Sequence, residues 1–228
     1  MKKNKVDFDV YTDNYNSLLR EGTGFFTDSD AYFARYKVDI LRGEVPSGTN
    51  SVLEYGCGIG RNIPFLKAAF PDAKISGSDI SAASLYIARM ENPGIEFFLE
   101  EAGSDNNKTY DVIFIAGVFH HIPLQDRSAV MISLFQRLVP GGFILVFEHN
   151  PFNPITRKIV NQCPYDKDAL LLKPSHLRNL LLIANFQIIR SAYCLFIPPK
   201  ISALLPLESK LHWLPFGGQY WIKATRTA

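Results

Sequence analysis

The chain has 228 residues, 47% of them hydrophobic, and its 24 basic and 22 acidic residues give a formal net charge of +2. This length and hydrophobic content are enough for the core of one α/β domain, a class that commonly reaches about 250 residues. No stretch is basic enough to follow a phosphate backbone, so nucleic acid is a disfavoured partner, although a single tRNA nucleotide is not excluded.

The cysteines and the hydropathy exclude further classes. Cys57, Cys163 and Cys194 are widely spaced and form no C-x-x-C pair, so neither a disulfide framework nor a metal site is expected. The early lysines are followed by Asp7–Asp9 rather than by an apolar stretch, and no apolar run approaches the ~18 residues of a membrane span. The sequence therefore predicts a cytoplasmic protein without a signal peptide.

Residues 1–48 are rich in aromatic side chains and are divided by the segment 21–24, which reads Glu-Gly-Thr-Gly. This pattern predicts two helices before the first strand. Either Tyr15 or Tyr11 could close over a bound ligand, although packing between the helices and a sheet is the simpler explanation of each.

The segment 51–62 is the most informative part of the chain. An apolar run containing Glu54 ends in three alternate glycines, Gly56, Gly58 and Gly60, which allow a ligand to approach the backbone closely. The G-x-G-x-G spacing differs from the G-x-G-x-x-G of dinucleotide sites, and a carboxylate here would repel phosphate but attract an ammonium group. The pattern favours a nucleoside cofactor with an α-amino group; the alternative is a tight turn without a ligand.

A second strand, Lys74–Asp79, ends in an acid at the place where such folds bind ribose hydroxyls. Ser81 is expected to cap a helix that runs to about Met90. The alternative role of Asp79 is to cap this helix. A third strand is predicted at residues 95–99, followed by Glu100, Glu101 and Ala102.

The clearest strand is Tyr110–Ala116, a continuous apolar run as buried parallel strands require. Gly117 follows it, and then come His120 and His121. A helix is predicted over 126–138, stopped by the Val-Pro-Gly-Gly of 139–142, and the fifth strand over 143–147.

These motifs, in this order, resemble the Rossmann-like (class I) S-adenosylmethionine-dependent methyltransferases over about residues 50–150. The resemblance implies an α/β fold with a seven-stranded, mostly parallel sheet, an antiparallel last strand, helices on both faces and an N-terminal helical cover. It also implies that Glu101 and Ala102 read the adenine, with Glu100 as an alternative. The cofactor residues then expected are Tyr15, Glu54, Gly56, Cys57, Gly58, Asn62, Asp79, Ile80, Glu101, Ala102, Ala116, Gly117 and His120.

The remainder, 151–228, is expected to form the substrate-side lid and the last strands of a single domain whose cap is 1–48 and whose cofactor core is 50–150. A proline-broken loop after the fifth strand leads into a lid helix over 153–161. An outer helix over 174–184, a strand over 186–196 and the last strand over 219–225 follow. The apolar connection 197–216 is expected to pack on the domain; contact with an apolar substrate, a partner subunit or a membrane surface is the alternative.

Methyl transfer requires a base only when the acceptor must lose a proton. His149 is the preferred candidate and His121 the second, whereas His120 is expected to shape the methionine pocket. The alternative role of His149 is a hydrogen bond that anchors the loop that follows it. The leading hypothesis is methylation of an oxygen or nitrogen of a small molecule, which could be apolar or lipid-linked. Carbon methylation or tRNA modification on the same fold, and a catalytically silent cofactor-binding interaction protein, are the alternatives; the glycine spacing and Glu54 disfavour a dehydrogenase.

Overall fold

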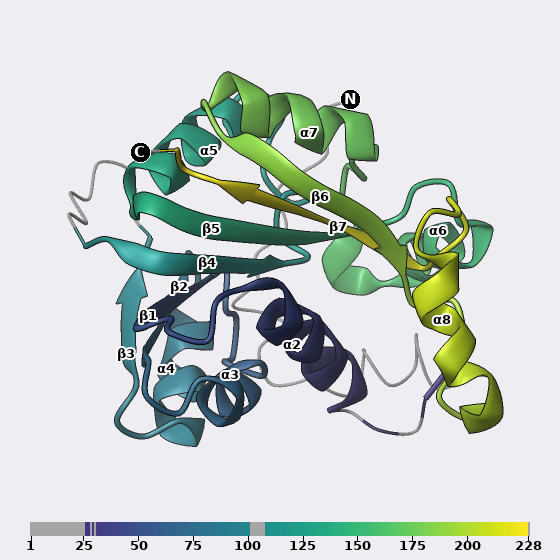
Figure 1. The fold of residues 1–228 in the computed structure, drawn as a ribbon, viewed down its shortest axis with the longest axis horizontal. Helices are drawn as coiled ribbons and strands as arrows, with labels where there is room; N and C mark the ends of the chain where they lie inside the picture. The colour runs from purple at the N-terminus through teal and green to yellow at the C-terminus, as the bar shows by residue number, and fades with distance from the viewer. Residues whose placement is uncertain (1–25, 28, 30, 101–107, 228) are drawn as a thin grey trace.

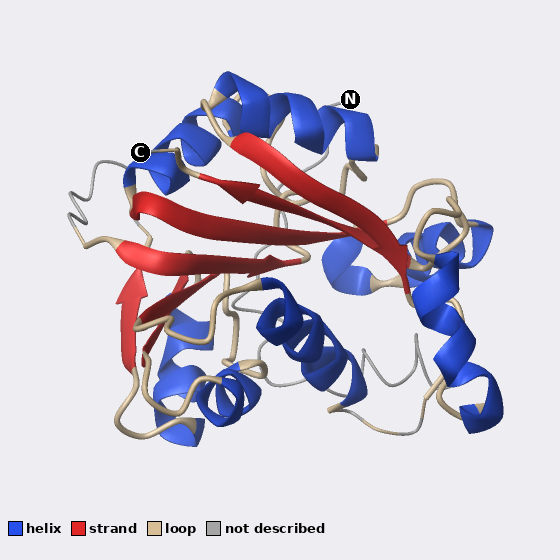
Figure 2. Ribbon diagram, viewed as in Figure 1, coloured by secondary structure: helices blue, strands red, loops and turns tan. Residues whose placement is uncertain are grey.

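The computed structural model describes residues 26–227 apart from 28, 30 and 101–107. Its centre is a seven-stranded sheet in the order β3-β2-β1-β4-β5-β7-β6 (Figures 1 and 2). Neighbouring strands from β3 to β5 are parallel, and β7 runs antiparallel to both β5 and β6. The strands are Ser51–Tyr55 (β1), Lys74–Asp79 (β2), Glu96–Leu99 (β3), Tyr110–Ala116 (β4), Leu138–His149 (β5), Gln187–Cys194 (β6) and Gln219–Thr225 (β7).

Helices cover both faces of this sheet. Those on one face are Tyr32–Glu44 (α2), Ile63–Ala69 (α3) and Ala82–Glu91 (α4), and those on the other are Arg127–Gln136 (α5) and Pro174–Ile183 (α7). Each group buries apolar side chains against its own face, Val38 and Leu66 on the first and Met131 and Leu181 on the second. The helices Pro154–Gln162 (α6) and Leu205–Leu211 (α8) lie beyond the end of the sheet where β4 and β5 finish (Figure 1).

The predicted mixed sheet with an antiparallel last strand and helices on both faces is confirmed. Ser81 caps α4 as expected, because its side chain accepts a hydrogen bond from the Ser84 amide at 2.9 Å. The first predicted helix lies outside the described residues, and α2 forms the described part of the helical cover. The division of the chain into cap, core and lid stays a prediction.

Two predictions about the elements were wrong. The Val-Pro-Gly-Gly segment does not separate helix and strand, because it lies inside β5, where the pairing with β4 shifts between Tyr110 and Val112. A bulge can accommodate these residues because Gly141 adopts a φ of 80°. The connection 197–216 contains a short 3-10 helix, Ser202–Leu204, and then α8. Its large apolar side chains are not buried against the domain as predicted, because Trp213 is 69% exposed and Phe216 is 66% exposed. Within the described residues, no helix is both long and apolar enough to cross a bilayer.

Candidate active site

The glycine loop after β1 has the backbone that the sequence predicted. Gly56, Gly58 and Gly60 have φ values of 69°, 53° and 81°, a region that other residues rarely adopt. A Cβ on Gly56 would lie 2.4 Å from Cγ2 of Val118, so this glycine is required by packing. A Cβ on Gly58 would meet nothing within 4 Å. The loop therefore leaves open space beside Gly58, where a ligand can lie directly on the backbone.

Glu54 lies on β1 just before this loop and is 1% exposed. Its Oε1 accepts a hydrogen bond from the Asn62 side-chain amide, whereas its Oε2 has no hydrogen-bond partner. Burial raises the pKa of Glu54 to about 8, although Asn62 and the charge of Lys37 act in the opposite direction. A buried carboxylate oxygen without a donor is costly, and an ammonium group is the ligand that would satisfy it.

Lys37 supplies a positive charge to the same region, and sequence reasoning missed it. It lies on α2, and its charge interacts favourably with Glu54 and Glu148. Burial lowers its pKa. The signal was present: Lys37 is half-buried on α2, beside the buried stripe that Ala34, Val38 and Leu41 form at helical spacing, where an apolar residue is expected.

Asp79 ends β2 and holds the loop in place. Its Oδ2 accepts a hydrogen bond from the Gly58 amide at 2.8 Å, and its Oδ1 accepts one from the Ser81 amide at 2.9 Å. Ser81, not Asp79, caps α4, so the alternative role for Asp79 was wrong. Ile80 beside it is 53% exposed, as a side chain that offers an apolar surface to a ring would be. Glu100 accepts a hydrogen bond from Arg137 at 2.8 Å, which makes it a poor alternative for reading the adenine.

Several other predicted residues have limited roles or lie outside the described residues. The Cys57 side chain is 6% exposed and burial raises its pKa above the usual range, so only its backbone can meet a ligand and it is no nucleophile. Ala116 ends β4 and Gly117 follows it, and the Gly117 amide donates to the Phe147 carbonyl at 2.9 Å. Tyr15, Glu101 and Ala102 lie outside the described residues.

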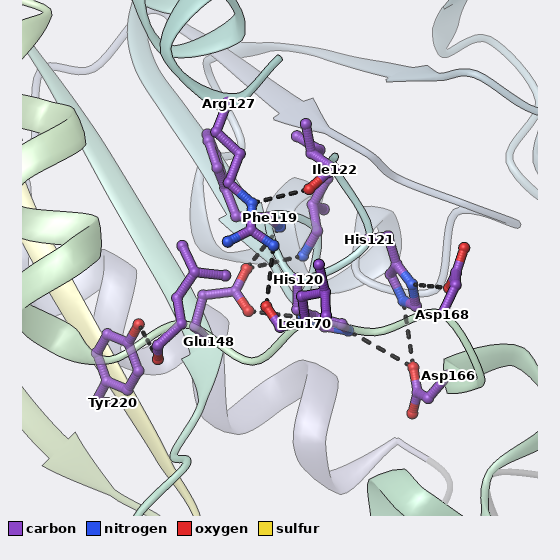
Figure 3. A network of polar contacts seen from close by, with 12 residues as sticks. Phe119, His120, His121, Ile122, Arg127, Glu148, Asp166, Asp168, Leu170 and Tyr220 are labelled. Atoms are coloured by element: carbon purple, nitrogen blue, oxygen red, sulfur yellow. Dashed lines mark hydrogen bonds and ion pairs between the residues drawn. The ribbon is translucent and has the colours of Figure 1, made fainter. Parts of the chain in front are cut away.

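His120 is fixed by protein carboxylates (Figure 3). It is 2% exposed, its Nδ1 lies 2.7 Å from Oε2 of Glu148, and its Nε2 lies 3.6 Å from Oδ1 of Asp166. Burial opposes a charge on the ring, but Glu148 and Asp166 outweigh it and raise the pKa of His120 to about 9. Glu148 also accepts hydrogen bonds from the Val118 and Phe119 amides. Both ring nitrogens of His120 thus face protein carboxylates, which leaves the ring itself to form part of a pocket wall.

His121 is held in a similar way. Its Nε2 lies 3.2 Å from Oδ1 of Asp166, and its Nδ1 lies 3.4 Å from Oδ1 of Asp168. Since both nitrogens face carboxylates, the geometry argues against the predicted role of His121 as a base. Asp166 ends the short 3-10 helix Pro164–Asp166 (η2), after α6, so sequence spacing could not reveal this contact.

His149 is the last residue of β5, and its ring centroid lies 5.0 Å from that of His120. Burial and the charge of His120 lower its pKa to about 4. No hydrogen bond joins its ring nitrogens to other parts of the chain that the structure describes. His149 is therefore a neutral imidazole with available lone pairs at neutral pH, but a weak base.

A glycine loop, a buried acid before it and a second acid at the end of the next strand define a nucleoside-binding α/β protein. Comparison with known proteins names the family: residues 53–144 match the family described as "Methyltransferase domain". The solved structure of a SAM-dependent methyltransferase from Archaeoglobus fulgidus has the same fold, with a TM-score of 0.68 and 17% identity over 92% of this chain and 99% of that one. Residues 53–144 therefore carry the sequence pattern of a methyltransferase domain, and the fold is that of S-adenosylmethionine-dependent methyltransferases.

Two curated relatives carry specific names. Trans-aconitate 2-methyltransferase of Methylobacterium radiotolerans is 34% identical over 95 residues, which are 41% of this chain and 36% of that enzyme. Phosphoethanolamine N-methyltransferase of Triticum aestivum is 30% identical over 134 residues, 56% of this chain and 25% of that enzyme. The chain thus spans well under two thirds of the length of these relatives.

Proposed function

We propose that this protein transfers a methyl group from S-adenosylmethionine to an oxygen or nitrogen of a small molecule. The observation that carries the proposal is the unsatisfied Oε2 of Glu54, buried beside the glycine loop and near the charge of Lys37. The amino-acid end of the cofactor is a zwitterion, so its recognition requires one acid and one base. Glu54 and Lys37 offer this pair where the loop leaves room for a ligand.

In this proposal the cofactor is held by residues from several elements. Glu54 pairs with the α-ammonium group of the cofactor, and Lys37 pairs with its α-carboxylate. Asn62 orients Glu54 through its hydrogen bond. Asp79 accepts hydrogen bonds from the ribose hydroxyls in addition to those it already accepts from two backbone amides. The remaining contacts come from the adenine side and from the backbone around the methyl group: Ile80, Glu101, Ala102, Gly56, Cys57, Gly58, Ala116, Gly117, Tyr15 and the wall formed by His120.

The protonation state of His149 limits the chemical classes of methyl acceptor that fit this site. Bound S-adenosylmethionine supplies an electrophilic sulfonium methyl, so the acceptor atom mainly needs a lone pair in line with it. A base with a pKa of about 4 is poorly matched to phenols, alcohols or carbon acids at neutral pH. A carboxylate or an amine needs little or no help, and His149 can orient it. The names of the two curated relatives, which refer to trans-aconitate and phosphoethanolamine, agree with this range.

An apolar acceptor is supported by the surface beyond the carboxyl ends of the strands. Trp213 and Phe216 follow α8, while Phe152 precedes α6, and all three are at least 50% exposed. The two segments lie side by side, because the Asn153 side chain donates to the Phe216 carbonyl at 2.7 Å. We propose that this surface receives an apolar part of the acceptor; the same side chains would suit a peripheral contact with a membrane. The cytoplasmic location stays a prediction.

Calorimetry with S-adenosylhomocysteine tests the cofactor site, and transfer of a labelled methyl group to carboxylates, amines and phenols tests the reaction. We expect binding of one equivalent and turnover of carboxylates or amines in preference to phenols. Binding without turnover of any class would favour the interaction protein. Absence of binding would refute the proposal as a whole.

A further inference from the structure

A second group of ligand-type side chains lies beside the cofactor site. His120, His121 and Asp166 each offer one ligand atom, and these three atoms lie within 4.8 Å of one another (Figure 3). Both histidines point Nε2 at the same oxygen, Oδ1 of Asp166, at 3.6 and 3.2 Å. That oxygen is buried and accepts no hydrogen bond. The convergence of three ligand atoms on one point is the first sign of an ion site.

The outer contacts of both imidazoles have the arrangement of metal-binding histidines. A histidine that binds a metal through one nitrogen commonly donates its other N–H to a carboxylate, which fixes the ring and its tautomer. Here Nδ1 of His120 faces Glu148 at 2.7 Å and Nδ1 of His121 faces Asp168 at 3.4 Å. With Nδ1 protonated, each Nε2 would keep the lone pair that a metal ion requires, 3.6 and 3.2 Å from Oδ1 of Asp166.

The alternative is a buried ion-pair cluster in which both histidines are protonated and donate to Asp166. Charge-assisted hydrogen bonds between N–H and a carboxylate measure about 2.7–2.9 Å, and the two Nε2–Oδ1 distances, 3.6 and 3.2 Å, are longer. Two ligand atoms bound to one ion at about 2.0–2.1 Å in tetrahedral geometry are separated by about 3.3 Å. The two distances from the histidine Nε2 atoms to Oδ1 of Asp166 surround this value. Two imidazolium rings with centroids 4.1 Å apart would also repel each other.

We propose that His120, His121 and Asp166 bind one divalent transition-metal ion of the zinc type. Two imidazoles and one carboxylate suit Zn²⁺ and Co²⁺, and a three-ligand set leaves a coordination position for water or for an oxygen of a small molecule. The cysteine count, which suggested no metal site, is uninformative for a site without thiolates. The proposal goes beyond methyl transfer: of the three ligands only His120 borders the proposed cofactor site, and the groups proposed to bind the cofactor's charges and ribose take no part in it.

The backbone prepares this site by joining two distant segments. The Leu170 amide donates to the His120 carbonyl at 2.8 Å, and the Arg127 guanidinium donates to the carbonyls of Ile122 and Leu170. These bonds hold the segment that carries Asp166 against the turn after β4 (Figure 3). A bound ion would tie the lid side of the domain to the sheet, so metal binding is expected to slow amide exchange over residues 164–170.

The test is titration of the chelator-treated, tag-free protein with Co²⁺ and Zn²⁺, followed by the visible absorption of cobalt, by calorimetry and by amide exchange. We expect one equivalent to bind with the spectrum of a tetrahedral site. Asp166→Asn and His121→Asn should each raise Kd more than tenfold, since each removes a ligand. Asp168→Asn should weaken binding less, because it removes only the group that positions His121.

His176→Ala and His212→Ala are matched controls, since both histidines are exposed and lie outside the cluster; they should bind as the wild type does. Circular dichroism checks that every variant is folded, and S-adenosylhomocysteine binding without metal keeps this test separate from the cofactor site. The proposal is overturned if the wild type binds no stoichiometric ion. It is also overturned if folded Asp166→Asn and His121→Asn bind as tightly as the two controls, which would mean adventitious binding to surface histidines.

Discussion

Glu54→Gln tests the cofactor site most directly because it changes the charge of one buried group and little else. Glutamine keeps the size of the side chain and can still accept the hydrogen bond from Asn62. It removes the negative charge that Oε2 offers to an ammonium group. A hydrogen bond to a charged group contributes about 1.5–3 kcal/mol, so the ionised carboxylate should strengthen binding by roughly ten- to hundredfold or slightly more.

The raised pKa makes this advantage depend on pH. With a pKa of about 8 for Glu54, roughly a quarter of the carboxyl groups are ionised at pH 7.5 and about a hundredth at pH 6. Only the ionised form pairs with the cofactor ammonium, so binding releases a proton and affinity rises with pH. The cofactor's own amine, with an ordinary pKa of about 7.7–8.0, sets the upper limit of the useful range. We expect the wild type to bind about three- to fortyfold more tightly than Glu54→Gln at pH 7.5, and equally near pH 5.5.

Calorimetry with S-adenosylhomocysteine between pH 5.5 and 7.5, in two buffers of different ionisation enthalpy, measures both the affinity and the released proton. An unchanged pH slope in Glu54→Gln would refute the pairing of Glu54 with the ammonium. The free protein supplies a control. The pKa of Glu54 in the folded protein lies above its ordinary value of 4.5. The contribution of the protonated carboxyl group to the stability of the wild type is therefore fully present below about pH 4.5 and is lost as the pH rises through about 8. Glu54→Gln should therefore melt at a higher temperature than the wild type at pH 8, but not near pH 4.5.

Four further substitutions separate the roles proposed for the site. Lys37→Met should weaken S-adenosylhomocysteine binding by about tenfold or more in calorimetry while stabilising the free protein, because a buried cation is removed; weaker binding with lower stability would indicate a packing role. Asp79→Ala should raise Kd more than tenfold and also lower the melting temperature, since the amides of Gly58 and Ser81 lose their acceptor. Gly58→Val should abolish cofactor binding in a folded protein, and an unfolded variant would show that the glycine is mainly structural. His149→Ala should lower turnover about 10²-fold at unchanged cofactor affinity, because the acceptor loses its orienting contact; wild-type turnover at saturating cofactor should show no acid limb near pH 6.5, and such a limb would contradict the lowered pKa.

The backbone of the cofactor site could be predicted from the sequence because its signals are local. β2, β4 and β7 have the predicted bounds, since apolar runs bounded by turn residues mark them within a few positions. The positive φ of Gly58 and the cap at Ser81 also depend only on neighbouring residues. The wrong boundary of β5 has the same origin: Pro-Gly-Gly is a strong local turn signal, and the pairing with β4 overrides it.

Side-chain roles could not be predicted in the same way, because they depend on contacts between distant segments. The sequence placed His120 and His121 at a strand end, but their ring orientations follow from Glu148, Asp166 and Asp168, which come from β5 and from the segment after α6. The lowered pKa of His149 likewise results from burial and from the charge of His120. From the sequence alone, Lys37 stood out only as a cation beside the apolar stripe of a helix. Its contribution to the site depends on how α2 packs on the sheet.

Buried carboxylates that the protein itself leaves incompletely satisfied are the best guide to where ligands bind, because a folded chain rarely leaves such a group without partners unless something else supplies them. Within the described residues, the carboxylate oxygens in this state belong to Glu54, Asp166 and Glu208. Glu208 is compensated through its other oxygen, which accepts hydrogen bonds from the Tyr36 hydroxyl and from the Leu195 and Phe196 amides. Glu54 has one donor, and Oδ1 of Asp166 has two histidine nitrogens at 3.6 and 3.2 Å but accepts a hydrogen bond from neither. Among the described residues, the two carboxylate oxygens without such compensation are therefore those to which we assign the cofactor ammonium and the metal ion.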